Sequence, residues 1–130
     1  MEHTEIFKLI EQGRILYQDK KEEIKNINWE EHAKFKGVFL KHLIKGKETN
    51  NLFSSHLVKI DPNCIIDIHQ HEKLIELHEV IEGSGEFSLA DLNAPYHPGQ
   101  MAVIPKGVDH KVIANENGLV LLAKFFPALL

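Results

Sequence analysis

From residue 37 onward, short apolar runs alternate with residues that form turns. The runs are rich in Val, Ile, Leu and Phe, and clusters of Gly, Pro, Asn and Asp separate them. Such runs are typical of β-strands, and their spacing leaves no room for crossover helices. The pattern predicts strands at 38–44, 52–60, 64–70, 77–82, 85–90, 101–104, 110–114 and 119–126. Strands joined by close turns predict an antiparallel, all-β sandwich or barrel.

The first 36 residues follow a different pattern. Ile6, Leu9 and Ile10 share one face of a predicted short helix, for which Thr4 is the candidate cap and Gly13 the stop. The charged run 18–23 predicts a loop or a frayed second helix, and Trp29 is expected to anchor this segment. We therefore predict an N-terminal extension, residues 1–36, that packs on the barrel or on a partner, followed by a barrel domain, residues 37–130.

Composition and charge narrow the classes of partner. A length of 130 residues with 43% hydrophobic residues suits one globular domain. The net charge is −4 and Arg14 is the single arginine, which argues against nucleic acid, an anionic membrane surface and a multiply phosphorylated substrate. The start of the chain has no features of a secretory signal, and Cys64 is the single cysteine. We expect a cytoplasmic protein without a disulfide.

Nine histidines are many for this length, and some of them are arranged. His69 and His71 lie two residues apart on a predicted strand, so both imidazoles should face the same side. Glu76 follows His71 by five residues, and His110 follows the tight turn 105–109. In a closed barrel these side chains can converge. Imidazole and carboxylate bind borderline divalent metals, and four such ligands leave an octahedral ion two open positions, as at catalytic centres.

These residues resemble the two sequence motifs of the cupin family. The first motif, Gly-x5-His-x-His-x4-Glu-x6-Gly, is matched by His69, His71, Glu76 and Gly83, with Asn63 in place of the opening glycine. The second, Gly-x5-Pro-x-Gly-x2-His-x3-Asn, is matched by Gly99, Pro105, Gly107 and His110, with Ala114 in place of the asparagine. Asn is the next best residue for a left-handed turn, so we expect Asn63 to adopt that conformation.

The resemblance implies an antiparallel double-stranded β-helix, the jelly-roll or cupin barrel, with a short helical N-terminal extension. It implies that His69, His71, Glu76 and His110 bind one divalent metal ion, which would be Fe, Mn, Ni, Co or Zn. Small proteins of this family are commonly homodimers, so a homodimer is expected.

Three functions are consistent with these residues. The first is a metal-dependent oxygenase, isomerase or lyase that acts on a small polar or chelating metabolite, such as a sugar, a diol, or a keto- or hydroxy-acid. The second is a non-catalytic module that binds or senses a small molecule. The third is a barrel with a structural metal and an interaction role.

Several further residues are candidates for the interior. His78, two residues after Glu76, should also face inward. It is our candidate catalytic acid or base, and the alternatives are a hydrogen-bond partner of a metal ligand, a substrate contact or a core histidine. Asp67 is expected either to orient a ligand imidazole or to lie at the surface, and the facing of His56 is open.

The remaining expectations concern the pocket rim and lining. Tyr96 and His97 belong to a predicted loop, 95–99, that can overhang the barrel mouth. The other histidines are expected at the surface: His3, His32 and His42. An apolar pocket lining is expected from Ile66 or Ile68, Val80, Met101 and Val103.

Overall fold

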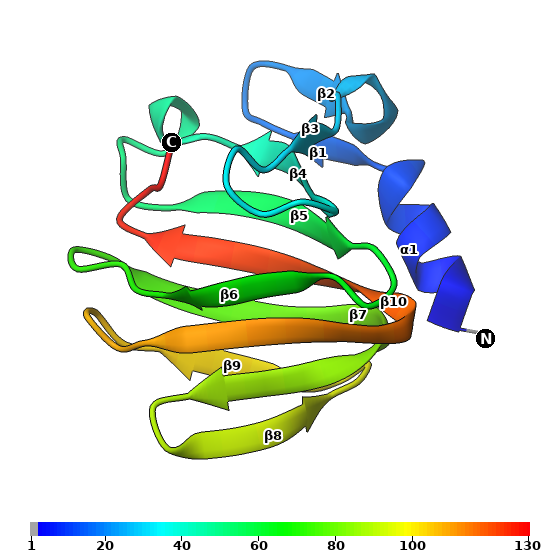
Figure 1. The fold of residues 1–130 in the computed structure, drawn as a ribbon. Helices are drawn as coiled ribbons and strands as arrows, with labels where there is room; N and C mark the ends of the chain where they lie inside the picture. The colour runs from blue at the N-terminus through cyan, green and yellow to red at the C-terminus, as the bar shows by residue number, and fades with distance from the viewer. Residues whose placement is uncertain (1–2) are drawn as a thin grey trace.

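The computed structural model describes residues 3–130 as a β-barrel with an N-terminal extension packed on its outside (Figure 1). The extension comprises α1 (His3–Glu11), β1 (Arg14–Leu16), β2 (Lys21–Glu23), the 3-10 helix η1 (Ile24–Asn26) and β3 (Glu30–Glu31). The barrel comprises β4 (Val38–Ile44), the 3-10 helix η2 (Gly46–Glu48), β5 (Ser54–Ile60), β6 (Ile65–His69), β7 (Ile75–Leu89), β8 (Leu92–Tyr96), β9 (Met101–Ile104) and β10 (His110–Phe126). The predicted all-β jelly-roll barrel with a short N-terminal helix is confirmed.

All barrel strands pair antiparallel. The strand order is β3-β4-β5-β10-β7-β8, with β6 beside β10 and β9 beside β7. The first part of β10 lies between β6 and residues 85–89 of β7, whereas its second part lies between β5 and residues 75–83 of β7. The long β7–β10 pair therefore runs through both halves of the barrel and joins them.

In two places, two strands predicted as separate are one continuous strand with a bend. The predicted strands 77–82 and 85–90 both belong to β7, and 110–114 and 119–126 both belong to β10. The bend falls at Gly83, which has a φ of 82° and lies so close to the opposite strand that an added Cβ would be 2.1 Å from the carbonyl oxygen of Gly118. Only a glycine permits this approach, so a break in the pattern marks a bend and not an end.

Strand β8 was missed by the sequence analysis, which predicted a loop over 95–99. It is an edge strand that pairs with β7 alone. Proline lacks an N–H group, and Pro95 is tolerated here because the other edge of β8 has no strand beside it to bond with. Asn63, by contrast, has a φ of 63°, as its place in the first motif predicts.

The inner face of the barrel forms the main core. Alternate residues of β5, β7 and β10 point inward and bury apolar side chains such as Val58, Val80, Phe87, Val112 and Leu121. Burial of a Val, Leu or Phe side chain contributes about 1.5–3 kcal/mol, so this layer holds the strands that carry the histidines in place.

The N-terminal extension covers the outer face of the same barrel. Leu43, Leu57, Ile81 and Val120 point outward and form a second buried cluster with Ile24 of η1. Partly buried residues complete this cluster, among them Phe7, Ile10 and the expected anchor Trp29. Part of the apolar surface of the extension therefore covers its own barrel, whereas Ile6, Leu9 and Leu16 are exposed. A homodimer stays a prediction.

Two details of the extension differ from expectation. The charged run 18–23 is neither a loop nor a helix throughout, because Lys21–Glu23 forms β2 and pairs with β1. Strand β3 pairs with β4 and so extends the barrel sheet across the predicted domain boundary at residue 36. Within residues 3–130 no helix is long and apolar enough to cross a membrane. The capping role of Thr4 and the surface position of His3 concern side chains outside the described part.

Candidate metal centre

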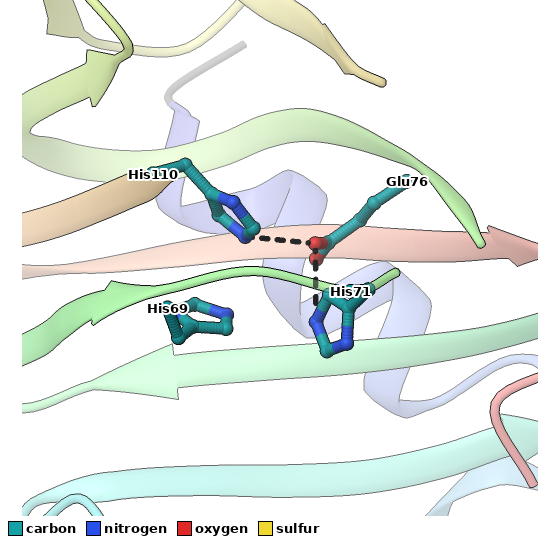
Figure 2. A group of neighbouring side chains, drawn as sticks. All are labelled: His69, His71, Glu76 and His110. Atoms are coloured by element: carbon teal, nitrogen blue, oxygen red, sulfur yellow. Dashed lines mark ion pairs between the residues drawn. The ribbon is translucent and has the colours of Figure 1, made fainter. Parts of the chain in front are cut away.

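Three strands bring His69, His71, Glu76 and His110 together at one end of the barrel interior (Figure 2). His69 is the last residue of β6 and His110 the first of β10, and the two residues are paired in register. Glu76 lies at the start of β7, and His71 lies in the turn before it. Each residue offers one ligand atom, and these atoms all lie within 4.8 Å of one another. The four side chains predicted from the motif can thus hold one metal ion.

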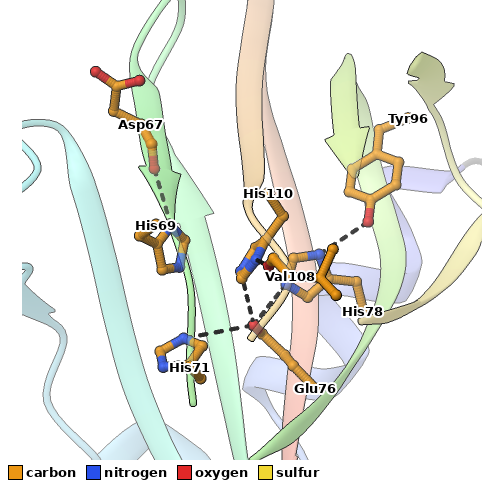
Figure 3. A network of polar contacts seen from close by, with 8 residues as sticks. All are labelled: Asp67, His69, His71, Glu76, His78, Tyr96, Val108 and His110. Atoms are coloured by element: carbon orange, nitrogen blue, oxygen red, sulfur yellow. Dashed lines mark hydrogen bonds and ion pairs between the residues drawn. The ribbon is translucent and has the colours of Figure 1, made fainter. Parts of the chain in front are cut away.

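Backbone carbonyls orient two of the imidazoles (Figure 3). The Nδ1–H of His69 donates to the carbonyl of Asp67 at 2.9 Å, and that of His110 donates to the carbonyl of Val108 at 3.0 Å. With the proton on Nδ1, each ring presents the lone pair of Nε2 toward the other members of the group. Two rings are therefore held in the tautomer that binds a metal.

Asp67 contributes through its backbone and not through its carboxylate. Its side chain is exposed and accepts a hydrogen bond from the amide of Ile68. A β-bulge in β6 puts both Asp67 and Ile68 opposite Lys111 of β10, and neither side chain faces the interior. Of the two alternatives expected for Asp67, the surface position is the one observed, and only its backbone carbonyl orients His69.

A contact between Glu76 and His110 indicates that this group of four side chains requires a cation. Glu76 Oε1 and His110 Nε2 are both buried, lie 3.2 Å apart and have no hydrogen-bond partner. The carboxylate oxygen accepts, and so does Nε2 while Nδ1 carries the ring proton. Two buried acceptors at this distance need a cation between them, either a proton or a metal ion. The donor set and these two orphaned atoms fit a divalent ion.

The pKa shifts of three of the four residues, Glu76, His69 and His71, also suit metal binding. Burial raises the pKa of Glu76, but His78 and His110 lower it by more, so the pKa lies well below its usual range. Burial lowers the pKa of His69 and His71 despite smaller opposing effects. Burial also lowers the pKa of His110, but the adjacent Glu76 carboxylate and the Val108 carbonyl raise it above its usual value, so a metal ion would have to displace a proton from this ring. An ionised carboxylate and neutral imidazoles are the forms that bind metals.

His78 faces the interior as predicted and contacts Glu76 directly. Its Nε2–H donates to Glu76 Oε2 at 2.7 Å, and its Nδ1 accepts from the Tyr96 hydroxyl at 2.9 Å (Figure 3). This assignment follows because the carboxylate only accepts. The contact occupies Oε2 and leaves Oε1 directed toward His110 and His71.

Tyr96 is a residue of this network that the sequence analysis placed in a loop over the mouth. It is 2% exposed, belongs to β8 and stacks on Phe87 with ring centroids 4.6 Å apart. Burial and the charge of Glu76 raise its pKa, so the hydroxyl keeps its proton and donates to His78. His97, in contrast, is exposed in the turn before β9.

A cavity of about 100 Å³ inside the barrel is lined by three of the four residues, His69, His71 and Glu76. Apolar side chains make up much of its wall, including Val58, Ile66, Val112, Leu121 and Phe125. Ile66 lines it as expected, whereas Ile68, Met101 and Val103 are at least 60% exposed and point outward. Val80 belongs to the buried core. The predicted apolar pocket exists, but other strands supply much of its lining.

Three further histidines line this cavity. His32 and His42, expected at the surface, are partly exposed, but both also contribute to the cavity wall, together with His56. His42 and His56 are cross-strand partners on the inner faces of β4 and β5. Strand alternation from Val38 could have indicated the inward facing of His42, since Val38, Leu40 and His42 share one face.

The cupin domain family matches residues 56–123 of this chain, which is more than half of its length. Together with the barrel and its His and Glu group, this match shows that the chain belongs to the cupin family. No curated protein matches it in sequence.

Solved structures resemble the barrel closely. KdgF from Halomonas sp. has a TM-score of 0.71 and 22% identity over 79% of this chain and 90% of that chain. A protein described as a predicted oxalate decarboxylase from Thermotoga maritima has a TM-score of 0.73 and 22% identity over 79% and 95%. An RmlC-like cupin from Shewanella frigidimarina has a TM-score of 0.69 and 19% identity over 81% and 87%. At these identities the likeness concerns the fold.

Proposed function

We propose that this chain is a metal-dependent enzyme whose substrate is a small chelating oxygen compound. The observation that carries the proposal is the pair of buried, unpartnered acceptors on Glu76 and His110, which lie in a four-residue group beside an interior cavity. A purely structural ion would not require a cavity next to its ligands, whereas a substrate would.

The cavity supports a small substrate. Its volume of about 100 Å³ is below the 300 Å³ or more that is usual for drug-sized ligands, so it suits a molecule of a few heavy atoms. None of its lining residues is lysine or arginine. Negative charge on a substrate must therefore be met by the metal ion or by histidine. Keto-acids, hydroxy-acids and diols fit this description, and so does oxalate, for which one structural relative is named.

Each residue has a proposed role. His69, His71, Glu76 and His110 would hold the ion, and Glu76 would offset part of its charge. A bound metal would supply Lewis acidity or activate oxygen. His78 and Tyr96 would hold Glu76 with Oε1 toward the ion, because they occupy Oε2. Both ring nitrogens of His78 already take part in hydrogen bonds, to Tyr96 and Glu76, which supports a role in positioning Glu76. Acid or base catalysis by His78, the role expected from the sequence, stays a prediction.

The test is elemental analysis of untagged protein, with Glu76→Gln and His97→Gln as variant and matched control. We expect near-stoichiometric metal in the parent and in His97→Gln, and at least a tenfold loss in Glu76→Gln. Metal-loaded parent would then be assayed with oxalate, keto-acids and diols, with and without oxygen. No bound metal after loading with Mn²⁺, Fe²⁺ and Co²⁺ would refute the proposal. Metal and ligand binding without turnover would instead favour the non-catalytic binding module.

A further inference from the structure

A second polar group crosses the barrel wall on the side of β4 and β5. His42 and His56 are opposite each other in register, and their Nδ1 atoms lie 2.8 Å apart. His42 Nε2 lies 3.4 Å from Oε2 of Glu30 on β3. The exposure falls along this series, from 65% at the Glu30 side chain through 11% at His42 to 1% at His56. The three residues thus lead from solvent to the interior.

His42 has one face on each side of the wall. It lines the interior cavity together with His56, and it also lines two outer clefts, one of them with Glu30 and Trp29. His56 lines only the interior cavity among these spaces. The contact between the two imidazoles is therefore a connection through the barrel wall.

The hydrogen bonds of this series have one consistent direction. The amide of Leu129 donates to Ser54 Oγ at 2.9 Å, so the Ser54 hydroxyl is free to donate to His56 Nε2 at 2.8 Å. His56 then carries its proton on Nδ1 and donates to His42 Nδ1. His42 consequently carries its proton on Nε2, facing the Glu30 carboxylate. The reverse arrangement of neutral rings would put the Nε2 lone pair of His42 against a carboxylate, which is repulsive.

We propose that Glu30, His42 and His56 form a proton path between the interior cavity and solvent. In the outward direction a cavity molecule gives a proton to His56 Nε2 in place of the Ser54 hydroxyl. The Nδ1 proton of His56 moves to His42 Nδ1, and the Nε2 proton of His42 moves to Glu30 Oε2 and then to water. Both rings end in the opposite tautomer, from which the same steps run inward.

The environment of the two imidazole rings favours passing a proton on over keeping it bound. Burial lowers the pKa of His56 to about 4, aided by His42 and Lys45 and opposed by Glu76. Burial also lowers the pKa of His42, with Glu30 opposing and Lys45 assisting. The outer clefts add further charged groups: Lys20, Lys21, Glu22, Lys47 and Glu48. Near neutral pH neither ring retains a second proton, so a proton that enters at one end leaves at the other.

The path ends next to the candidate metal centre. His56 and His71 line the same cavity, and the ring of Phe125 contacts both, with centroid distances of 5.5 Å and 5.3 Å. A substrate in the cavity would thus contact the metal group at one end and His56 at the other. The use of this proton path in a reaction rests on the proposed function, whereas the existence of the path does not depend on it.

The test is ¹⁵N imidazole NMR on the full chain without added metal. We expect His56 protonated on Nδ1 and a scalar coupling across the Nδ1–H···Nδ1 bond to His42. Exchange of that proton with water should slow about tenfold or more in Glu30→Gln, which replaces the outer carboxylate by an amide that cannot take up a proton, at an exposed position. His32→Gln, a cavity histidine outside the path, is the matched control and should leave the exchange rate unchanged.

Two results would overturn the path: a His56 protonated on Nε2, or an exchange rate that Glu30→Gln does not change. The proposed function fails separately. Metal content should be equal in the parent and Glu30→Gln, and a parent that binds no metal refutes the enzyme while the NMR result still decides the path.

Discussion

Acid should destabilise this protein through His56, and the size of the effect follows from its burial. The His56 side chain is 1% exposed, and burial, with His42 next in importance, lowers its pKa from 6.5 to about 4. In the unfolded chain the imidazole regains its usual pKa of about 6.5. Between these two values the unfolded state binds a proton that the folded state does not.

The sign follows from this difference. The contribution of neutral His56 to stability is fully present above pH 6.5, declines as the pH falls below 6.5 and is lost near pH 4. The interval between the two pKa values corresponds to about 3 kcal/mol of unfolding free energy. This is a large share of the 5–15 kcal/mol that is usual for a domain.

Urea denaturation at intervals from pH 7 to pH 4 measures this loss. Burial also lowers the pKa of four partly buried histidines, which contribute to the loss: His32, His42, His69 and His71. The informative quantity is therefore the difference between the parent and His56→Gln, which cannot titrate. We expect the parent to lose about 3 kcal/mol more than the variant over this range. His97→Gln removes an exposed imidazole as the matched control and should follow the parent curve. Parallel pH curves for the parent and His56→Gln would refute the reasoning.

Two further substitutions test the bend and the network behind the metal ligands. Gly83→Ala would place a Cβ 2.1 Å from the carbonyl oxygen of Gly118, and we expect a loss of about 3 kcal/mol or more in chemical denaturation. Gly99→Ala, with a φ of 96° but no atom within 4 Å of the added Cβ, should cost only about 1 kcal/mol; equal losses would contradict the role of the close approach. Tyr96→Phe removes the donor to His78 and should lower Mn²⁺ affinity about tenfold in titration calorimetry without unfolding the barrel; unchanged affinity would show that the hydroxyl does not act through His78.

Local sequence determined much of this protein. Strands follow from runs of β-branched and aromatic residues, and the left-handed turn at Asn63 follows from its residue type. The spacing of His69, His71, Glu76 and His110 indicated a common group through its resemblance to the cupin motifs, and ligands on these strands can converge when a sheet closes. These are properties of short segments, and a single sequence displays them directly.

Whether a side chain points into or out of the barrel was harder to predict where the strand is irregular. Alternation indicates which side chains share a face only while the strand stays regular, and the bulge in β6 turns both Asp67 and Ile68 outward. In β9 the alternation held, but the choice of face did not follow from the residue types: Met101 and Val103 are exposed although both are apolar. The packing of neighbouring strands decides which face of an apolar run is covered.

Only the tertiary structure decided which distant residues became partners. His42 faces His56 because β4 and β5 pair in one register, and Tyr96 reaches His78 because the edge strand β8 lies beside β7 in the closed barrel. A shift of one residue in either strand would turn these side chains to the opposite face without changing the sequence pattern. The metal ligands can thus be recognised along the chain, whereas the hydrogen-bonded network around them depends on registers that the whole barrel sets.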